Sequence, residues 1–143
     1  MTGLFILLAL FAVQDQPPAS AWTWTLYDGE NPVVLANEVP DTAHLRSTFE
    51  CEAGSGVAQV SIYDFGAVSG FVRFGSGTAV ATSQIASPRD GTLTAPLRTD
   101  HPAFAAFVTE GRLTLTVGDR QRIVEVPRPH LAKLRRFAEL CAG

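Results

Sequence analysis

Hydrophobic and polar residues alternate along much of the chain after residue 21, which is the pattern of strands that bury one face. Residues 22–27 alternate large apolar side chains with Thr, and residues 45–51 place Leu45, Ser47, Phe49 and Cys51 on one face. Further strands are expected at 33–36, 58–62, 70–74, 78–85, 92–97, 112–117 and 120–126. Turn residues at 28–32, 54–56, 75–77, 87–91 and 118–119 separate these strands, which favours antiparallel hairpins.

Two segments follow the period of a helix. Thr99 or Asp100 can cap a helix near 101–110, which has Pro102 in its first turn and Gly111 at its end. A C-terminal helix (129–141) carries one apolar stripe, made of Leu131, Leu134, Phe137, Ala138 and Cys141. The pattern predicts a mainly β fold, an antiparallel β-sandwich or open barrel, with the C-terminal helix packed on the sheet.

The part of the chain before Trp22 resembles a targeting segment. An apolar run from Leu4 to Val13 is followed by Ala19-Ser20-Ala21, the small-x-small pattern of a signal peptidase site, although no Lys or Arg precedes the run. We therefore expect a cleaved signal peptide (1–21), a single β-rich domain (22–143), and a periplasmic or secreted location. The alternatives are a buried N-terminal helix or a short uncleaved anchor, which would make the protein a membrane-tethered accessory subunit.

The chain has two cysteines, Cys51 at the end of a predicted strand and Cys141 on the apolar stripe of the last helix. They have no C-x-x-C or His spacing that would suggest metal or redox chemistry. In an oxidising compartment they are expected to form a disulfide; the alternative is two buried free thiols.

The composition excludes several classes of protein. The 143 residues are 46% hydrophobic with a mean hydropathy of +0.15, so a disordered chain is excluded. No run of 18 apolar residues occurs, so no stable membrane span is expected.

One stretch resembles a known family. Three consecutive motifs carry the resemblance: Phe104-x-x-Phe107-x-x-x-Gly111-x-Leu113-x-Leu115, then 123–127, then Leu131-x-x-Leu134-x-x-Phe137. Together they are similar to the C-terminal part of the invasion-associated locus B proteins. A similar short helix, hairpin and closing helix ending in Cys occurs in an accessory protein of type VI secretion. The resemblance is confined to this C-terminal stretch, departs from the first family in having a single cysteine pair, and implies an exported bacterial β-protein. It transfers no catalytic residue.

The sequence has no nucleotide-binding loop, G-x-S-x-G elbow or zinc-protease motif. Its three histidines are far apart, with no neighbour at ligand spacing, so we expect no metal and no cofactor. Folding would have to assemble a hydrolytic site from His44 or His101 with Ser61 and Asp64 or Asp100. A small periplasmic hydrolase is therefore the alternative to a non-catalytic protein.

Charge is unevenly distributed. Residues 22–64 carry seven acids and one base, Arg46, whereas six of the eleven bases lie between 120 and 136. These six are the candidate site for an anionic partner: Arg120, Arg122, Arg128, Lys133, Arg135 and Arg136. The partner would be an anionic envelope component, such as a lipid headgroup or polymer, or another envelope protein, and export argues against nucleic acid. The alternatives are a solvated helix face or a basic face docked on the acidic half.

Trp22 and Trp24 are candidate stacking residues for a sugar or peptide, although large alternating residues in a first strand more often belong to the core. The leading functional hypothesis is an exported, non-catalytic interaction module of the envelope or the secreted fraction.

Overall fold

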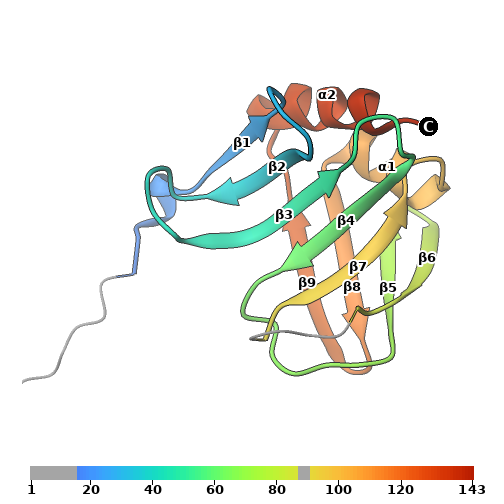
Figure 1. The fold of residues 1–143 in the computed structure, drawn as a ribbon. Helices are drawn as coiled ribbons and strands as arrows, with labels where there is room; N and C mark the ends of the chain where they lie inside the picture. Colours follow the sequence, from blue (N-terminus) through green and yellow to red (C-terminus); the bar gives the residue numbers. More distant parts are fainter. Residues whose placement is uncertain (1–15, 87–90) are drawn as a thin grey trace, which may run out of the picture.

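The structure is a computed structural model that describes residues 16–86 and 91–143, and it consists of two antiparallel sheets (Figure 1). The five-stranded sheet has the order β1 (Thr23–Tyr27), β2 (Val33–Glu38), β3 (Leu45–Cys51), β4 (Val57–Ile62), β7 (Leu93–Arg98). The four-stranded sheet has the order β6 (Ala79–Gln84), β5 (Phe71–Ser76), β8 (Arg112–Val117), β9 (Arg120–Glu125). The predicted apolar run 4–13 and most of the turn 87–91 lie outside the described residues.

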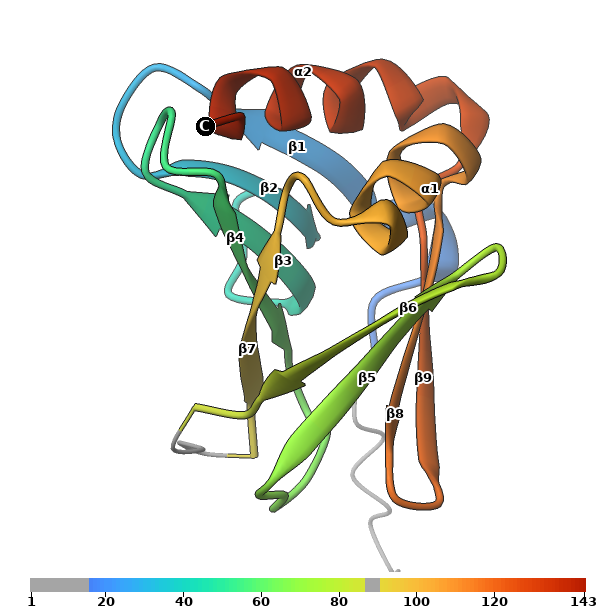
Figure 2. The ribbon, with the colours of Figure 1, turned by 90° about the vertical axis from the view of Figure 1, so that its right-hand side faces the viewer.

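Two α-helices cover one end of the two sheets, as Figure 2 shows. Helix α1 (Pro102–Glu110) packs on β5, β6 and β8, and α2 (Leu131–Cys141) packs on β1, β2 and α1. Short 3₁₀ turns precede β1 (η1, Ala19–Ala21) and α2 (η2, Arg128–His130). The predicted mainly β fold, with a short helix and a C-terminal helix on the sheet, is confirmed; the two sheets stay separate, as in a sandwich.

The core lies between the inner faces of the sheets and under the helices. Phe49 of β3 is fully buried at its centre. Its ring centroid lies 5.2 Å from that of Phe107 on α1, 6.3 Å from that of Phe137 on α2 and 6.2 Å from that of Trp24 on β1. Because one side chain contacts both helices and the first strand of the sheet, the helices are fixed relative to the five-stranded sheet.

The ends of α1 correct one expectation and confirm another. Neither Thr99 nor Asp100 caps the helix: the N-cap is His101, whose ring Nδ1 accepts a hydrogen bond from the backbone N–H of Ala103 at 3.0 Å. Pro occupies the first helical position, so the residue immediately before it must be the cap. The helix ends at Gly111 with φ 75°, the left-handed conformation that the sequence predicted.

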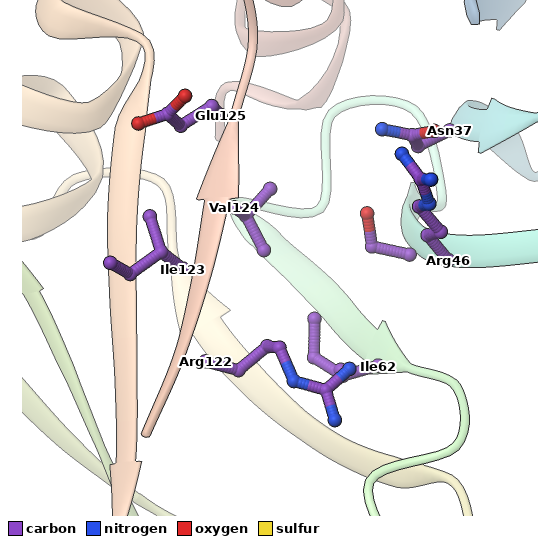
Figure 3. A pocket seen from close by; sticks show the side chains of 8 residues that line it. Asn37, Arg46, Ile62, Arg122, Ile123, Val124 and Glu125 are labelled. Atoms are coloured by element: carbon purple, nitrogen blue, oxygen red, sulfur yellow. The ribbon is translucent and has the colours of Figure 1, made fainter. Parts of the chain in front are cut away.

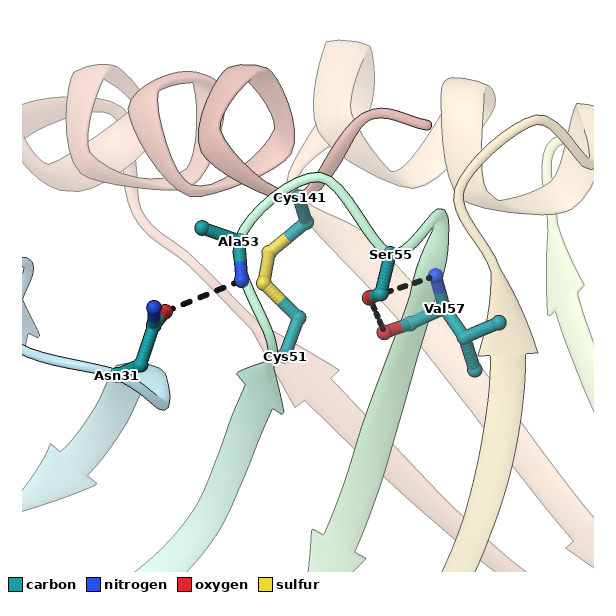
Figure 4. The surroundings of a disulfide bond; sticks show 6 residues. All are labelled: Asn31, Cys51, Ala53, Ser55, Val57 and Cys141. Atoms are coloured by element: carbon teal, nitrogen blue, oxygen red, sulfur yellow. Dashed lines mark hydrogen bonds between the residues drawn. A yellow bond between two sulfur atoms is a disulfide. The ribbon is translucent and has the colours of Figure 1, made fainter.

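Cys51 at the end of β3 and Cys141 at the end of α2 form a disulfide, with their Cα atoms 5.9 Å apart (Figure 4). The turn between β3 and β4 also binds the end of the helix, because the N–H groups of Gly54 and Gly56 donate to the carbonyl oxygens of Leu140 and Cys141 at 2.9 and 2.7 Å. Both glycines have φ 74°. The turn therefore satisfies carbonyls that a helix end leaves without partners.

Candidate functional site

A groove runs between β9, the edge strand of the four-stranded sheet, and the facing strands of the other sheet (Figure 3). We call it the β9 groove. It has a volume of about 510 Å³ and is lined by Asn37, Arg46, Ser47, Ile62, Arg122, Ile123, Val124 and Glu125. A hollow of this size is within the range of ligand-binding clefts.

Strand alternation orients the β9 side of the groove. Arg122 and Val124 point into the groove in Figure 3, whereas Ile123 and Glu125 point away from it. Val124 is buried, and Ile123 is 42% exposed on the outer face of the sheet. The side chains that face the groove from β9 are thus one apolar residue and one guanidinium.

A β-bulge orients the opposite side. Asn37 of β2 is paired with Ser47 of β3, and the next pair is Glu38 with Leu45, so Arg46 is an extra residue without a partner on β2. A bulge breaks strand alternation and redirects the side chain of the extra residue. Arg46 lines the groove as a result, whereas Asn37 reaches it by ordinary alternation, on the same face of β2 as the buried Leu35.

The guanidinium of Arg46 is held by an aromatic ring. Its Cζ lies 4.0 Å from the ring centroid of Trp22, which in turn lies 6.4 Å from that of His44. In the uncleaved chain Arg46 also lines a second hollow of about 610 Å³ together with Gln16, Pro17, Trp22, Ala43, His44, Leu45, Tyr63 and Asp64, of which the first two belong to the segment expected to be removed. A cation stacked on Trp stays charged and keeps its edge N–H groups available for a ligand.

Arg122 is held by the loop that follows β4. Its Nη2 donates to the backbone oxygen of Asp64 at 3.2 Å, and its Cζ lies 5.5 Å from the ring centroid of Phe65. Arg120 donates to the backbone oxygen of Phe65 at 3.2 Å. These contacts use one of the five donor N–H groups of Arg122, so most of its donor capacity remains.

Neither Arg46 nor Arg122 has a carboxylate partner in the described part of the chain. The three ion pairs found there join other residues, and Glu125, whose side chain points away from the groove, is paired with Arg112 at 2.5 Å. The Oδ1 atom of Asn37 is buried, and it is the one buried side-chain polar atom in residues 16–86 and 91–143 without a hydrogen-bond partner. The groove therefore offers two positive charges, and a buried acceptor without a partner lies in its wall.

The six predicted basic residues do not form one surface. Arg120 and Arg122 lie at the start of β9, whereas the other four follow the end of that strand, on η2 and α2. Arg128, Arg135 and Arg136 are exposed, and Arg136 pairs with Glu139 at 3.4 Å. Lys133 is half-buried, and its Nζ donates to the backbone oxygen of Trp24 at 2.6 Å.

Lys133 also lies beside His130, with its Nζ 3.2 Å from the ring Nδ1. Burial, and then the charge of Lys133, lower the pKa of His130. A neutral His130 can accept a hydrogen bond from Lys133, whereas a protonated ring would repel the ammonium.

The two candidate stacking residues have different environments. Trp24 is 2% exposed, and its indole Nε1 donates to the backbone oxygen of Glu125 at 3.0 Å, so it belongs to the core and presents no free ring face. Trp22 is half-buried and stacked by Arg46 at the rim of the second hollow.

The residues of the hydrolase alternative are not assembled. Within the described ranges, no His ring nitrogen is hydrogen-bonded to a Ser hydroxyl or a carboxylate: His101 caps α1, and no hydrogen bond to the ring of His44 is found. Ser61 lies 3.0 Å from the hydroxyl of Thr94, and Asp100 binds Arg98 at 2.9 Å, a hydrogen bond that lowers its pKa.

Over the same ranges, no group of three or more His, Cys, Asp or Glu side chains is placed to hold a metal ion. No helix in the described part of the chain has the length and apolar character needed to cross a bilayer.

Comparison of the chain with protein-family models, with curated proteins and with solved structures gives no match.

Proposed function

We propose that the protein is an exported, non-catalytic interaction module of the cell envelope or the secreted fraction, and that it binds an anionic partner in the β9 groove. The observation that carries the proposal is the presence of Arg46 and Arg122 in one groove without a carboxylate partner among the described residues. Guanidinium groups bind carboxylates and phosphates through paired hydrogen bonds. Two such groups in one groove favour an anionic ligand.

The compartment is part of the same proposal. A disulfide between Cys51 and Cys141 is typical of a protein that folds in an oxidising environment. Removal of the segment 1–21 and kinship with the invasion-associated locus B proteins would both fit export. The intact mass of the protein recovered from its native host tests the first point, because cleavage after Ala21 removes a segment whose mass follows from the sequence.

The exposed bases of α2 and of the turn before it are the competing anion site. Arg128, Arg135 and Arg136 are exposed to solvent, where salt screens their charge. The groove favours binding more strongly, because its guanidiniums are held by Trp22 and by the loop after β4. Side chains that are already ordered lose less conformational entropy when a ligand binds.

The test compares three forms of the chain as baits for periplasmic extract at low salt. These are the wild type, the groove variant Arg46→Gln/Arg122→Gln and the helix variant Arg135→Gln/Arg136→Gln, which removes the same number of charges. We expect a component that the wild type and the helix variant retain and the groove variant loses, and whose retention falls as salt is added.

Retention lost only in the helix variant would move the site to α2 and contradict the groove assignment. Background retention by all three baits would refute the interaction module itself. Turnover of ester or amide substrates that disappears in His44→Ala would favour the hydrolase alternative.

A further inference from the structure

The backbone of β9 has one free side, and that side faces the groove. The N–H of Val126 donates to the carbonyl oxygen of Gly111 at 2.7 Å, toward β8, whereas the carbonyl of Glu125 in the same peptide unit accepts from Trp24 on the opposite side. Backbone direction alternates along a strand, so the N–H and C=O of Ile123 point away from β8 as the carbonyl of Glu125 does. No strand pairs with that edge within the described residues.

The free edge is short and bounded at both ends. Trp24 occupies it at Glu125, and at the other end Arg120 and Arg122 bind the loop after β4. Between these bounds an added chain can pair with Ile123 and its neighbours over about three residues, at about 3.3 Å for each residue.

The side chains around this edge narrow the chemistry of the occupant. Arg46 and Arg122 supply donors and positive charge, which suit a carboxylate or a phosphate. The free carbonyl of Ile123 calls for a hydrogen-bond donor as well. A phosphate or a lipid phosphodiester has no N–H to offer, whereas a peptide carries both an N–H at every residue and, at Asp or Glu, a carboxylate.

We propose, on the basis of the proposed function, that the partner binds the β9 groove through an extended acidic peptide segment that adds a short strand to β9. The backbone of the segment pairs with the N–H and C=O of Ile123, and an Asp or Glu side chain lies between Arg46 and Arg122. Main-chain pairing supplies affinity in this mode of recognition, and the side-chain pocket supplies the preference for an acidic residue.

The test titrates the ¹⁵N-labelled protein with pentapeptide mixtures, acetyl-X-X-Glu-X-X-amide and the same mixture with Gln in the centre, and follows the amide resonances of 121–124. Glutarate and phosphatidylglycerol vesicles serve as anions that have no peptide backbone. We expect the Glu mixture to bind at least about ten-fold more tightly than the Gln mixture, since a charge-assisted hydrogen bond lost from a site costs about that factor. It should also bind more tightly than glutarate, which has the carboxylate but no backbone to pair with β9.

Two changes address strand pairing directly. Ile123→Pro removes the N–H that points into the groove, and an edge strand tolerates proline where its N–H faces away from the neighbouring strand. Ile123→Val is the matched control, since it changes the side chain and keeps the N–H. On the ligand side, two further versions of the Glu mixture carry an N-methyl group, one at Glu and one at the next residue. Adjacent N–H groups point in opposite directions, so one of these two methylated mixtures should bind more weakly than the parent Glu mixture.

The outcomes separate this inference from the proposed function. Equal binding of the Glu mixture by Ile123→Pro and Ile123→Val, with no effect of either N-methylation, would overturn strand addition. Binding of glutarate or of vesicles as tight as that of the Glu mixture, and lost in Arg46→Gln/Arg122→Gln, would overturn the peptide assignment and leave an anion-binding groove. No shift at 121–124 with millimolar Glu mixture would also overturn the inference, and the extract experiment then decides the proposed function alone.

Discussion

Loss of the disulfide is the perturbation with the largest expected effect on stability. Replacing both cysteines, Cys51→Ala/Cys141→Ala, opens a loop that spans a sequence separation of 90 residues. The entropy gained by the unfolded chain corresponds to about 4 to 5 kcal/mol of lost stability at 25 °C. For a domain of about 120 residues, 1 kcal/mol changes Tm by about 4 °C, so we expect a decrease of about 15 to 20 °C.

The folded state should survive this change, because α2 keeps its other contacts. Leu134 and Phe137 stay buried, and the N–H groups of Gly54 and Gly56 still bind the helix end. The assay is thermal unfolding followed by circular dichroism, with and without a phosphine reductant. Reductant should lower the Tm of the wild type to about that of the double variant and leave the double variant unchanged. A decrease of less than about 5 °C in both experiments would refute the role given to the crosslink.

Three further predictions concern local structure. Gly111→Ala should lower the free energy of unfolding by more than about 2 kcal/mol in urea titrations, because the added Cβ overlaps backbone and the residue has φ 75°. Gly118 is the control: its φ is 60° and the space around it is open, so Gly118→Ala should cost only about 1 kcal/mol. His101→Ala should cost about 1 kcal/mol through loss of the helix cap, measured in the same titration. The pKa of His130 is lowered from 6.5 in the folded state, so its contribution to stability is present above pH 6.5 and is lost as pH falls. His130→Gln should therefore flatten the pH dependence of Tm between pH 7 and 5. An unchanged slope would contradict this.

Most of the fold could be predicted because its strands have one buried face. The alternation in 58–62 and 112–117 is local information, and both segments lie in strands that bury alternate residues. The hairpin at Gly118 and the end of α1 at Gly111 were predictable for the same reason, since a positive φ at glycine is a local property. The division of the strands between two sheets was not predictable from local patterns. Strand β7 pairs with β4 although the whole β5–β6 hairpin lies between them in the chain, and no local pattern encodes that pairing.

The site was less accessible to sequence reasoning. Arg122 was among the predicted residues, but Arg46 and Asn37 were missed. A bulge that adds one residue to β3 places Arg46 in the groove, and the strand expected at 33–36 ended before Asn37. The alternation assumed for 45–51 would have put Arg46 on the outer face. One signal was available: Arg46 is the lone base in the acidic segment 22–64, and an isolated opposite charge is a reason to ask what it binds.

The position of the groove follows from how the sandwich closes. Helices and the disulfide close one end, and β6 approaches β7 along one side, so the side where β9 faces the other sheet remains open. An open strand edge invites pairing with other chains, and proteins commonly protect such edges with charged side chains. Arg122 and Arg120 lie at this edge. The same charges that discourage pairing with a second basic β9 edge would attract an acidic segment, so protection against self-association and selection of a partner would depend on the same residues.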